Sequence, residues 1–310
     1  MRKFPKLHLI VTIPAYNEEK MITQVIKSIP RKLRGIDKIE VMVWSDGSTD
    51  QTMVTAKLAG ADYVFSNKKN LGLAKTFNRA TKRAVELGAD IIVNTDADNQ
   101  YDQKEISKLL VPIIEHGADM VSGDRQIQKL THMPVMNKYG NILGSWTIRM
   151  LTGTKLNDAS SGFRAYTRDA IKHFSLYSDH TYTHETIIQA VNQDMLVYEV
   201  PITFKKRVGG KSKLISSIYS HMKKSSATII RTILMYKALK VLVTIGSALI
   251  LLGMIGIVRF GTFYLDGNGS GHIQSLIFSS ILISIGFNTI LIGVIADLIS
   301  INRKLLEGRN

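Results

Sequence analysis

Two long runs without a single charge lie near the end of the chain, at residues 241–258 and 275–296. A helix of 18 residues rises about 27 Å, close to the thickness of the hydrocarbon layer of a bilayer. Turn-forming residues fill the stretch between the two runs, at residues 261–272. The alternative is a buried hairpin of a soluble domain. The pattern favours two transmembrane helices, at about residues 239–260 and 273–297, followed by a tail at 301–310.

Positive charges flank the outer ends of the two runs. Lys223, Lys224, Arg231, Lys237 and Lys240 precede the first run, and Arg303, Lys304 and Arg309 follow the second. The connecting stretch holds one cation at its edge, Arg259. Because cytoplasmic flanks are enriched in Lys and Arg, we expect a two-span protein of the cell membrane with both termini in the cytoplasm.

The segment before the first run, residues 214–238, has apolar residues at helical spacing with cations between them. This pattern predicts amphipathic juxtamembrane helices that lie in the headgroup layer. A helix packed on the soluble domain is the alternative.

Residues 1–213 alternate between strand-like and helix-like segments from residue 7 onward. This order predicts an α/β domain with a mostly parallel sheet and helices on both of its faces. Ligands of such domains bind beyond the carboxyl ends of the strands.

Polar residues follow four of the expected strands. They are the stretches that begin at Pro14, Asp46, Asp96 and Gly123. Glycine-rich fingerprints of a dinucleotide site or a P-loop do not occur in the chain, so neither of these nucleotide sites is expected.

Asp96, Asp98 and Gln100 stand two residues apart, directly after an apolar strand. In an extended stretch the three side chains point the same way, because strand side chains alternate. Oxygen ligands of this kind suit Mg²⁺ or Mn²⁺, which keep coordination sites for phosphate oxygens. The alternative is an acidic turn that caps the helix near Lys104.

The charge balance gives a second indication of a phosphorylated ligand. Lys and Arg number 40 against 25 Asp and Glu, a net charge of +15. Such an excess suits a polyanionic partner: nucleic acid, anionic lipid or a phosphorylated substrate. Aromatic residues make up only 7% and form no stripe with the cations, so no nucleic-acid partner is expected. The chain has no Cys, which excludes disulfides and thiolate metal sites.

Five motifs in order resemble one enzyme family. They are Pro14-Ala-Tyr-Asn-Glu18, Asp46-Gly-Ser-Thr-Asp50, Asp96-Ala-Asp-Asn-Gln100, Asp158-Ala-Ser-Ser-Gly-Phe-Arg164 and Arg207-Val-Gly-Gly-Lys-Ser-Lys213. Together they resemble the family-2 glycosyltransferases of the GT-A fold, in the branch of dolichyl-phosphate mannose synthase and polyprenyl-phosphate glycosyltransferases. The resemblance spans about residues 7–213.

The resemblance implies roles for individual residues. Donor-binding residues would be Pro14, Tyr16, Glu18, Trp44, Asp46, Asp96, Ala97, Arg125, Arg207 and Lys213. The metal ligands would be Asp96, Asp98 and Gln100, and the acceptor phosphate would meet Arg125, Lys138 and Arg164. Some relatives carry Arg near position 138, and a Lys there cannot make the bidentate contact of an Arg.

Asp158 and Arg207 are the expected catalytic residues. We expect Asp158 to orient Arg164 or the acceptor rather than to remove a proton, with a structural turn carboxylate as the alternative. The stretch from Arg207 to Lys213 would be a basic loop that closes over the donor, or a solvated linker. His184 and Glu185 are expected to pack inside the domain.

The resemblance implies an inverting, membrane-bound hexosyltransferase. It would move a hexose from a nucleotide-diphosphate sugar to a polyprenyl or dolichyl phosphate, for glycoconjugate or protein glycosylation. A processive or glycan-extending transferase is one alternative, although no Q-x-x-R-W motif is present. A catalytically degenerate membrane scaffold is another. The nucleotide base, the sugar, the lipid length and a homo-oligomeric state are left open.

Overall fold

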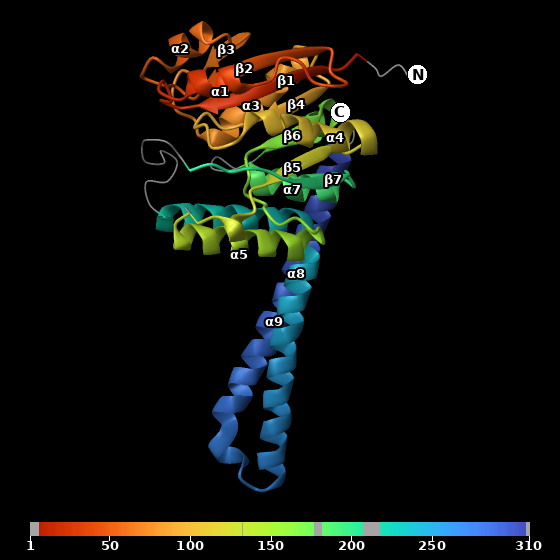
Figure 1. Ribbon diagram of the computed structural model, residues 1–310. Coiled ribbons are helices and arrows are strands. Elements are labelled where there is room, and N and C mark those ends of the chain that lie inside the picture. Colours follow the sequence, from red (N-terminus) through yellow and green to blue (C-terminus); the bar gives the residue numbers. More distant parts are fainter. Residues whose placement is uncertain (1–5, 132, 177–181, 207–217, 308–310) are drawn as a thin grey trace. The chain divides into compact units, whose positions relative to one another are not determined.

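The computed structural model describes residues 6–131, 133–176, 182–206 and 218–307, with side chains up to residue 206 and again from 238 to 302. The chain divides into two compact units, Met1–Ile229 and Ile230–Asn310. Figure 1 shows the elements of both units, which are described one at a time below.

A seven-stranded sheet forms the centre of the first unit, in the order β3-β2-β1-β4-β6-β5-β7. The strands are β1 (His8–Ala15), β2 (Lys38–Ser45), β3 (Tyr63–Ser66), β4 (Ile91–Asn94), β5 (Met120–Asp124), β6 (Arg164–Thr167) and β7 (Val197–Pro201). All neighbouring pairs are parallel except those of β6, which runs antiparallel to both β4 and β5. The expected α/β class with a mostly parallel sheet is confirmed.

Helices cover both faces of this sheet. They are α1 (Ile22–Ser28), α2 (Thr52–Leu58), α3 (Leu73–Glu86), α4 (Ile106–His116), α5 (Val135–Thr152), α6 (Arg168–His173) and α7 (Thr183–Asn192), with short 3₁₀ turns η1 (Gln103–Glu105) and η2 (Ile127–Lys129). Val11 and Ile13 of β1 are buried in one core with Val25 of α1 and Leu109 of α4. Strands buried on both faces explain the unbroken apolar runs in β1 and β4.

Four elements of the first unit were not expected from the sequence: β6, β7, α5 and α6. β6 follows a turn at residues 158–163 and enters the sheet between β4 and β5, so these two strands are not neighbours. Because β6 is antiparallel, its first residue lies at the edge where β4 and β5 end. The polar tips of β1, β2, β4 and β5 therefore share one edge with the turn that leads into β6, which we call the polar edge.

The second unit is a helical hairpin. It contains α8 (Ile218–Leu265) from residue 230 onward, the 3₁₀ turn η3 (Gly269–His272) and α9 (Ile273–Glu307), and the first residues of α8 belong to the first unit. Ala238–Leu265 and Gly269–Asn302 have mean hydropathies of 2.6 and 2.1 and are long enough to cross a membrane. Only 11% of each apolar window is buried, unlike a core helix of a soluble protein. Residues 214–217 of the expected amphipathic segment lie outside the described residues, as do the side chains of 218–237.

Glycines allow the two long helices to approach closely. A Cβ atom added to Gly246 would lie 2.6 Å from the carbonyl oxygen of Gly286, and a Cβ atom added to Gly286 would lie 2.6 Å from that of Gly246. Small residues at such crossings let helix backbones make close contact in lipid.

We expect Gly246→Ala to destabilise the hairpin, although alanine is the better helix former by about 1 kcal/mol. The added methyl group has to push the helices apart at the crossing. Gly261→Ala is the matched control, because no atom lies within 4 Å of its added Cβ. Thermal unfolding in one detergent checks both variants. An equal rise in melting temperature for the two would contradict the close crossing.

Candidate functional site

The acidic motif lies in a turn and not in an extended stretch. β4 ends at Asn94, residues 97–98 form a turn, and Asn99 has a φ of 59°. Asn tolerates this left-handed conformation better than most residues. The argument from strand alternation was therefore wrong for Asp96, Asp98 and Gln100. The backbone N–H of Gln100 donates to Oδ1 of Asp98 at 3.2 Å, so the turn itself keeps these two residues together.

Asp96 lies against the turn before β6. A Cβ atom added to Gly162 would be 2.9 Å from Oδ1 of Asp96 and 3.1 Å from the hydroxyl of Tyr182. The side chain of Asn94 donates to the carbonyl of Gly162 at 2.9 Å and to the hydroxyl of Tyr182 at 2.8 Å. A side chain at position 162 would displace the Asp96 carboxylate or the Tyr182 hydroxyl, so the close approach at Gly162 helps to position Asp96 at the polar edge.

Arg125, at the end of β5, forms a buried ion pair with Asp158. Its Nε donates to Oδ2 of Asp158 at 2.6 Å and its Nη2 donates to Oδ1 at 2.9 Å. The side chain of Arg125 is 10% exposed and that of Asp158 is fully buried. Nη2 also donates to Ser160. No described residue accepts a hydrogen bond from Nη1, which leaves that amino group available for a ligand.

The electrostatics of the pair oppose a role for Asp158 as a base. Burial disfavours its ionised form, but the charge and hydrogen bonds of Arg125 outweigh burial and hold the pKa of Asp158 below its usual value. Burial also disfavours the Arg125 cation, yet Asp158, Tyr101 and Asp96 together raise the pKa of Arg125. Both carboxylate oxygens of Asp158 already accept hydrogen bonds. The ion pair therefore holds the Arg125 guanidinium in place and does not supply a base.

A segment after β7, residues 202–206, runs beside the acidic motif, and we call it the strap. The backbone N–H of Lys205 donates to the carbonyl of Gln100 at 2.8 Å, and Nε2 of Gln100 donates to the carbonyl of Lys205 at 3.2 Å. Nζ of Lys205 lies 3.2 Å from the carboxylate of Asp102. The guanidinium of Arg125 stacks over Phe204 at 5.3 Å. The strap thus lies beside the acidic motif, and Arg207 and Lys213, which follow it in the sequence, lie outside the described residues.

The loops after β1 and β2 are joined to each other. Asn17 has a φ of 54°, and its Oδ1 accepts the backbone N–H of Thr49 at 2.8 Å. The backbone N–H of Glu18 donates to the hydroxyl of Thr52 at 2.9 Å. These bonds hold Tyr16, whose side chain is 37% exposed, at the polar edge next to the tip of β2. Pro14 is buried beneath it and pairs in register with Trp44.

Asp46 is engaged by the protein itself. Its carboxylate accepts hydrogen bonds from Nδ2 of Asn67 at 2.8 Å and from the backbone N–H groups of Leu71 and Gly72 at 2.8 and 2.9 Å. Gly47, with a φ of 72°, permits the approach of Lys69 and Asn70. Asp46 therefore fixes the loop 67–72 beside the expected donor pocket, a contact that the sequence analysis missed.

Trp44 is turned toward β3. Its Nε1 donates to Oδ1 of Asn67 at 3.0 Å and its ring lies 5.0 Å from that of Phe65. Arg79 of α3 also donates to Oδ1 of Asn67 at 2.8 Å. These contacts give Trp44 a packing role between the strands and α3, and its expected contact with the donor stays a prediction.

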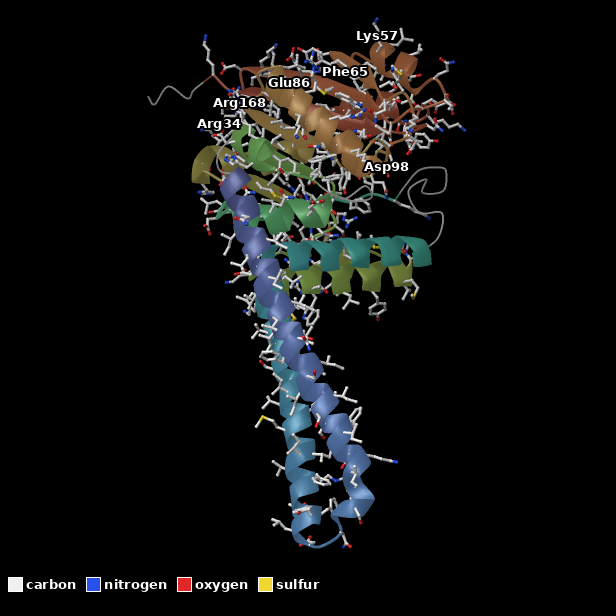
Figure 2. The ribbon with its side chains drawn as sticks, turned by 180° about the vertical axis from the view of Figure 1, so that it is seen from behind. Arg34, Lys57, Phe65, Glu86, Asp98 and Arg168 are labelled. Carbon is white, nitrogen blue, oxygen red and sulfur yellow. The ribbon has the colours of Figure 1, made fainter. Side chains whose placement is uncertain are left out.

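Figure 2 places Asp98 at the polar edge, with Arg34 and Arg168 at the opposite end of the sheet. The sequence agrees with this geometry: the profile of glycosyl transferase family 2 matches residues 10–174, more than half of the chain. The chain belongs to glycosyl transferase family 2.

The chain is similar to several transferases of this family, among them the following two. The chain is 32% identical over 203 residues to a dolichyl-phosphate hexose transferase of Haloferax volcanii, covering 65% of this chain and 84% of the relative. It is 31% identical over 215 residues to a UDP-N-acetylglucosamine–dolichyl-phosphate N-acetylglucosaminyltransferase of Methanococcus voltae, covering 63% and 84%.

A solved structure shares the fold of this family-2 chain. It is glucosyl-3-phosphoglycerate synthase from Mycobacterium tuberculosis in complex with Mn²⁺, UDP and phosphoglyceric acid, with a TM-score of 0.57 and 19% identity. The match covers 73% of this chain and 78% of that chain. It confirms the expected GT-A architecture.

Arg164 does not lie where the sequence analysis expected it. The residue is fully buried, and its guanidinium donates to the carbonyls of Thr183 and Ala159 and to the hydroxyl of Thr186. Its place in β6, under α7, explains this burial. The expectation that Asp158 orients Arg164 was therefore wrong, because the partner of Asp158 is Arg125. The full burial of Arg164 does not support its expected contact with the acceptor phosphate.

The remaining predicted residues have identified surroundings. Nζ of Lys138 on α5 donates to the carbonyl of Gln128 at 2.6 Å, so it ties α5 to η2, and its role toward a phosphate stays a prediction. Ala97 is buried in the core. The capping role considered for the acidic motif falls to Asp102, which accepts the backbone N–H of Lys104. His184 and Glu185 are buried on α7, as expected.

Asp158→Asn should lower the unfolding free energy by about 3 kcal/mol at pH 7, because it leaves the buried Arg125 charge unpaired. The pKa of Asp158 in the folded protein lies below its ordinary value of about 3.9. The ionised carboxylate therefore stabilises the folded protein fully above that ordinary value, and this stabilisation is lost as the pH falls through the folded pKa. The melting-temperature gap to the parent protein should shrink from pH 7 toward pH 3.

Differential scanning fluorimetry across this pH range measures the gap. Asp169→Asn is the control, because Asp169 is exposed and lies 3.9 Å from Lys172 in a surface pair. It should change the melting temperature little at any pH. A gap for Asp158→Asn that is constant with pH would show that the ion pair does not carry the stability.

Proposed function

We propose that the chain transfers a sugar from a nucleotide-diphosphate sugar to a polyprenyl phosphate, with inversion and with the aid of Mg²⁺ or Mn²⁺. The pairing of Gln100 with Lys205 carries this proposal, because it fastens the segment leading to Arg207 beside the acidic motif. A site for two phosphorylated substrates needs a cation-binding motif and basic groups side by side.

The relatives support the acceptor. Both named relatives are transferases that act on dolichyl phosphate, and their matches cover more than four fifths of their lengths. Their names differ in the sugar, a hexose in one and N-acetylglucosamine in the other. The proposal therefore names the class of donor and leaves its sugar and its base open.

The residues at the acidic motif fit a hard divalent cation. Asp96, Asp98 and the Oε1 of Gln100 are oxygen donors, and no described residue donates a hydrogen bond to that Oε1. Within the described part of the chain, no three His, Cys, Asp or Glu side chains gather into a metal site. Mg²⁺ binds through few protein ligands and keeps the remaining positions for water and phosphate. When bound, the ion would neutralise charge that develops on the leaving diphosphate.

The chain's own residues serve the acceptor side. A phosphate monoester has its second pKa near ~6 and is mostly dianionic at pH 7, so it attacks without a protein base. This agrees with Asp158, whose oxygens are occupied by Arg125. The Nη1 amino group of Arg125 would hold a phosphate while Asp158 fixes the other edge of the guanidinium.

The lipid acceptor requires a bilayer, and two features support membrane attachment. The hairpin α8–α9 is long and apolar enough to span it. In the first unit, α5 exposes an apolar face that includes Tyr139, Leu143, Trp146 and Met150. The helix carries Lys138 and Arg149 and no acidic residue. Such a face suits the headgroup layer of an anionic membrane. By the charge rule both termini would be cytoplasmic.

Asp98→Ala should reduce sugar transfer to a short polyprenyl phosphate by at least about 100-fold, since removal of charge stabilisation at the leaving group costs this much. Nucleotide binding measured by calorimetry should lose its dependence on Mn²⁺. Asp90→Ala is the matched control, because Asp90 precedes β4 at the opposite edge and accepts the backbone N–H of His8. Transfer by Asp98→Ala at the parent rate would contradict the proposal.

The assay uses a panel of UDP- and GDP-sugars, with and without chelator. Absence of metal-dependent nucleotide binding in the parent protein would favour the scaffold alternative. Chains longer than one sugar would favour the processive alternative.

The two tryptophans allow a direct test of α5. Trp44→Phe leaves Trp146 as the sole tryptophan, with half of its side chain exposed. In proteoliposomes, brominated phospholipids should quench its fluorescence strongly, because contact with lipid chains is required for quenching. Trp146→Phe is the control, since Trp44 is packed on Phe65 and should not be quenched. Equal quenching of the two variants would refute docking by α5.

A further inference from the structure

Glu199 holds the turn that carries Asp158. It lies on β7, next to β5 in the sheet. Its Oε1 accepts the backbone N–H groups of Asn157 at 2.9 Å and of Asp158 at 2.8 Å, and its Oε2 lies 2.8 Å from the N–H of Asn157. One carboxylate thus fixes two consecutive peptide groups at the start of the turn, and the function described so far does not use it.

Two further hydrogen bonds attach the first part of the same turn to α5. The backbone N–H of Ala159 donates to the hydroxyl of Ser145 at 3.0 Å, and the hydroxyl of Ser160 donates to Oδ1 of Asn141 at 2.6 Å. Glu199 is the attachment on the β7 side, directly behind Asp158. A displacement of the Asp158 backbone moves the carboxylate that binds the Nε–Nη2 edge of Arg125.

Empty space beside the turn makes this attachment consequential. A cavity of about 460 Å³ is lined by Glu199, Asn157, Asp124 and Arg149, among others. This pocket is partly open to solvent and is lined by both Glu199 and Asn157, so the turn has room to relax toward it once the carboxylate is removed.

The carboxylate itself is costly to keep. Burial raises the pKa of Glu199, the charges of Asp124 and Asp158 add to this, and the two backbone hydrogen bonds only partly offset them. A neutral side chain of the same shape would avoid that cost. The carboxylate is held beside the site by its hydrogen bonds to the backbone of Asn157 and Asp158, which is the arrangement of a positioning group.

We propose that Glu199 is a positioning residue which, through the backbone of Asn157 and Asp158, sets the direction in which Arg125 presents its remaining amino group to a substrate phosphate. The inference rests on the proposed function only in the identity of that phosphate ligand. The connection from Glu199 to Arg125 stands on the geometry.

The test combines structure and kinetics on the full chain in nanodiscs. Protein labelled with ¹⁵N-arginine gives a signal for the Nε–H of Arg125, which Arg125→Lys identifies by its loss. In Glu199→Gln this signal should shift and exchange faster, because the bond to Asp158 is loosened. The melting temperature should change by less than about 4 °C. Glu199→Asp, which keeps the charge but shortens its reach, should behave the same way.

For transfer to polyprenyl phosphate, kcat/KM of Glu199→Gln should fall about 10- to 100-fold, the cost of a misplaced group. In the Asp158→Asn background, Glu199→Gln should lower kcat/KM by less than about twofold further, because the effects of residues that act through one another are not additive. Asp119→Asn is the matched control, because Asp119 accepts the backbone N–H of Leu196 at the other end of β7. It should leave both the signal and kcat/KM unchanged.

An unchanged Arg125 signal in Glu199→Gln overturns the inference, and so do independent, multiplying effects of the two substitutions on kcat/KM. A changed signal in a protein that transfers no sugar to polyprenyl phosphate upholds the positioning role and refutes the proposed function.

Discussion

The ion pair between Arg125 and Asp158 connects the parts of the site. Taking a guanidinium and a carboxylate out of water is unfavourable unless their geometry is close and their other hydrogen bonds are satisfied. Here two parallel hydrogen bonds meet this requirement, and Ser160 takes a third. Arg125 also stacks on Phe204 of the strap. The end of β5, the turn before β6 and the strap are far apart in the sequence, and they meet in this one contact at the polar edge.

The sheet brings these segments together through one exception to its parallel order. β6 runs against its neighbours, so the turn before it arrives at the edge where β4 and β5 end. That turn supplies Asp158 on one side and Gly162 on the other. Gly162 receives the Asp96 carboxylate, and Asp158 receives Arg125. A regular parallel strand at this position would have placed its turn at the far edge.

The division into two units suits a transferase whose acceptor is a lipid. The first unit contains the acidic motif, the ion pair and the strap, all of them on a packed sheet. The second is a hairpin in which glycines bring two long helices into backbone contact. In lipid, close packing replaces the hydrophobic effect as the force between helices. The polar site and the apolar hairpin therefore follow different packing rules within one chain.

The sequence by itself determined the fold class, the polar edge, the apolar hairpin and the motifs of the family. These follow from local patterns: apolar periodicity, uncharged runs and short motifs at strand ends such as Asp96 to Gln100. The sequence did not reveal that Asp158 pairs with Arg125 and not with Arg164, that Asp46 holds the loop 67–72, or that Glu199 supports the Asp158 turn. Each of these is a contact between residues more than 20 positions apart. Only the tertiary structure decides which charge meets which, because burial and geometry, rather than residue type, set the partner of an ion pair.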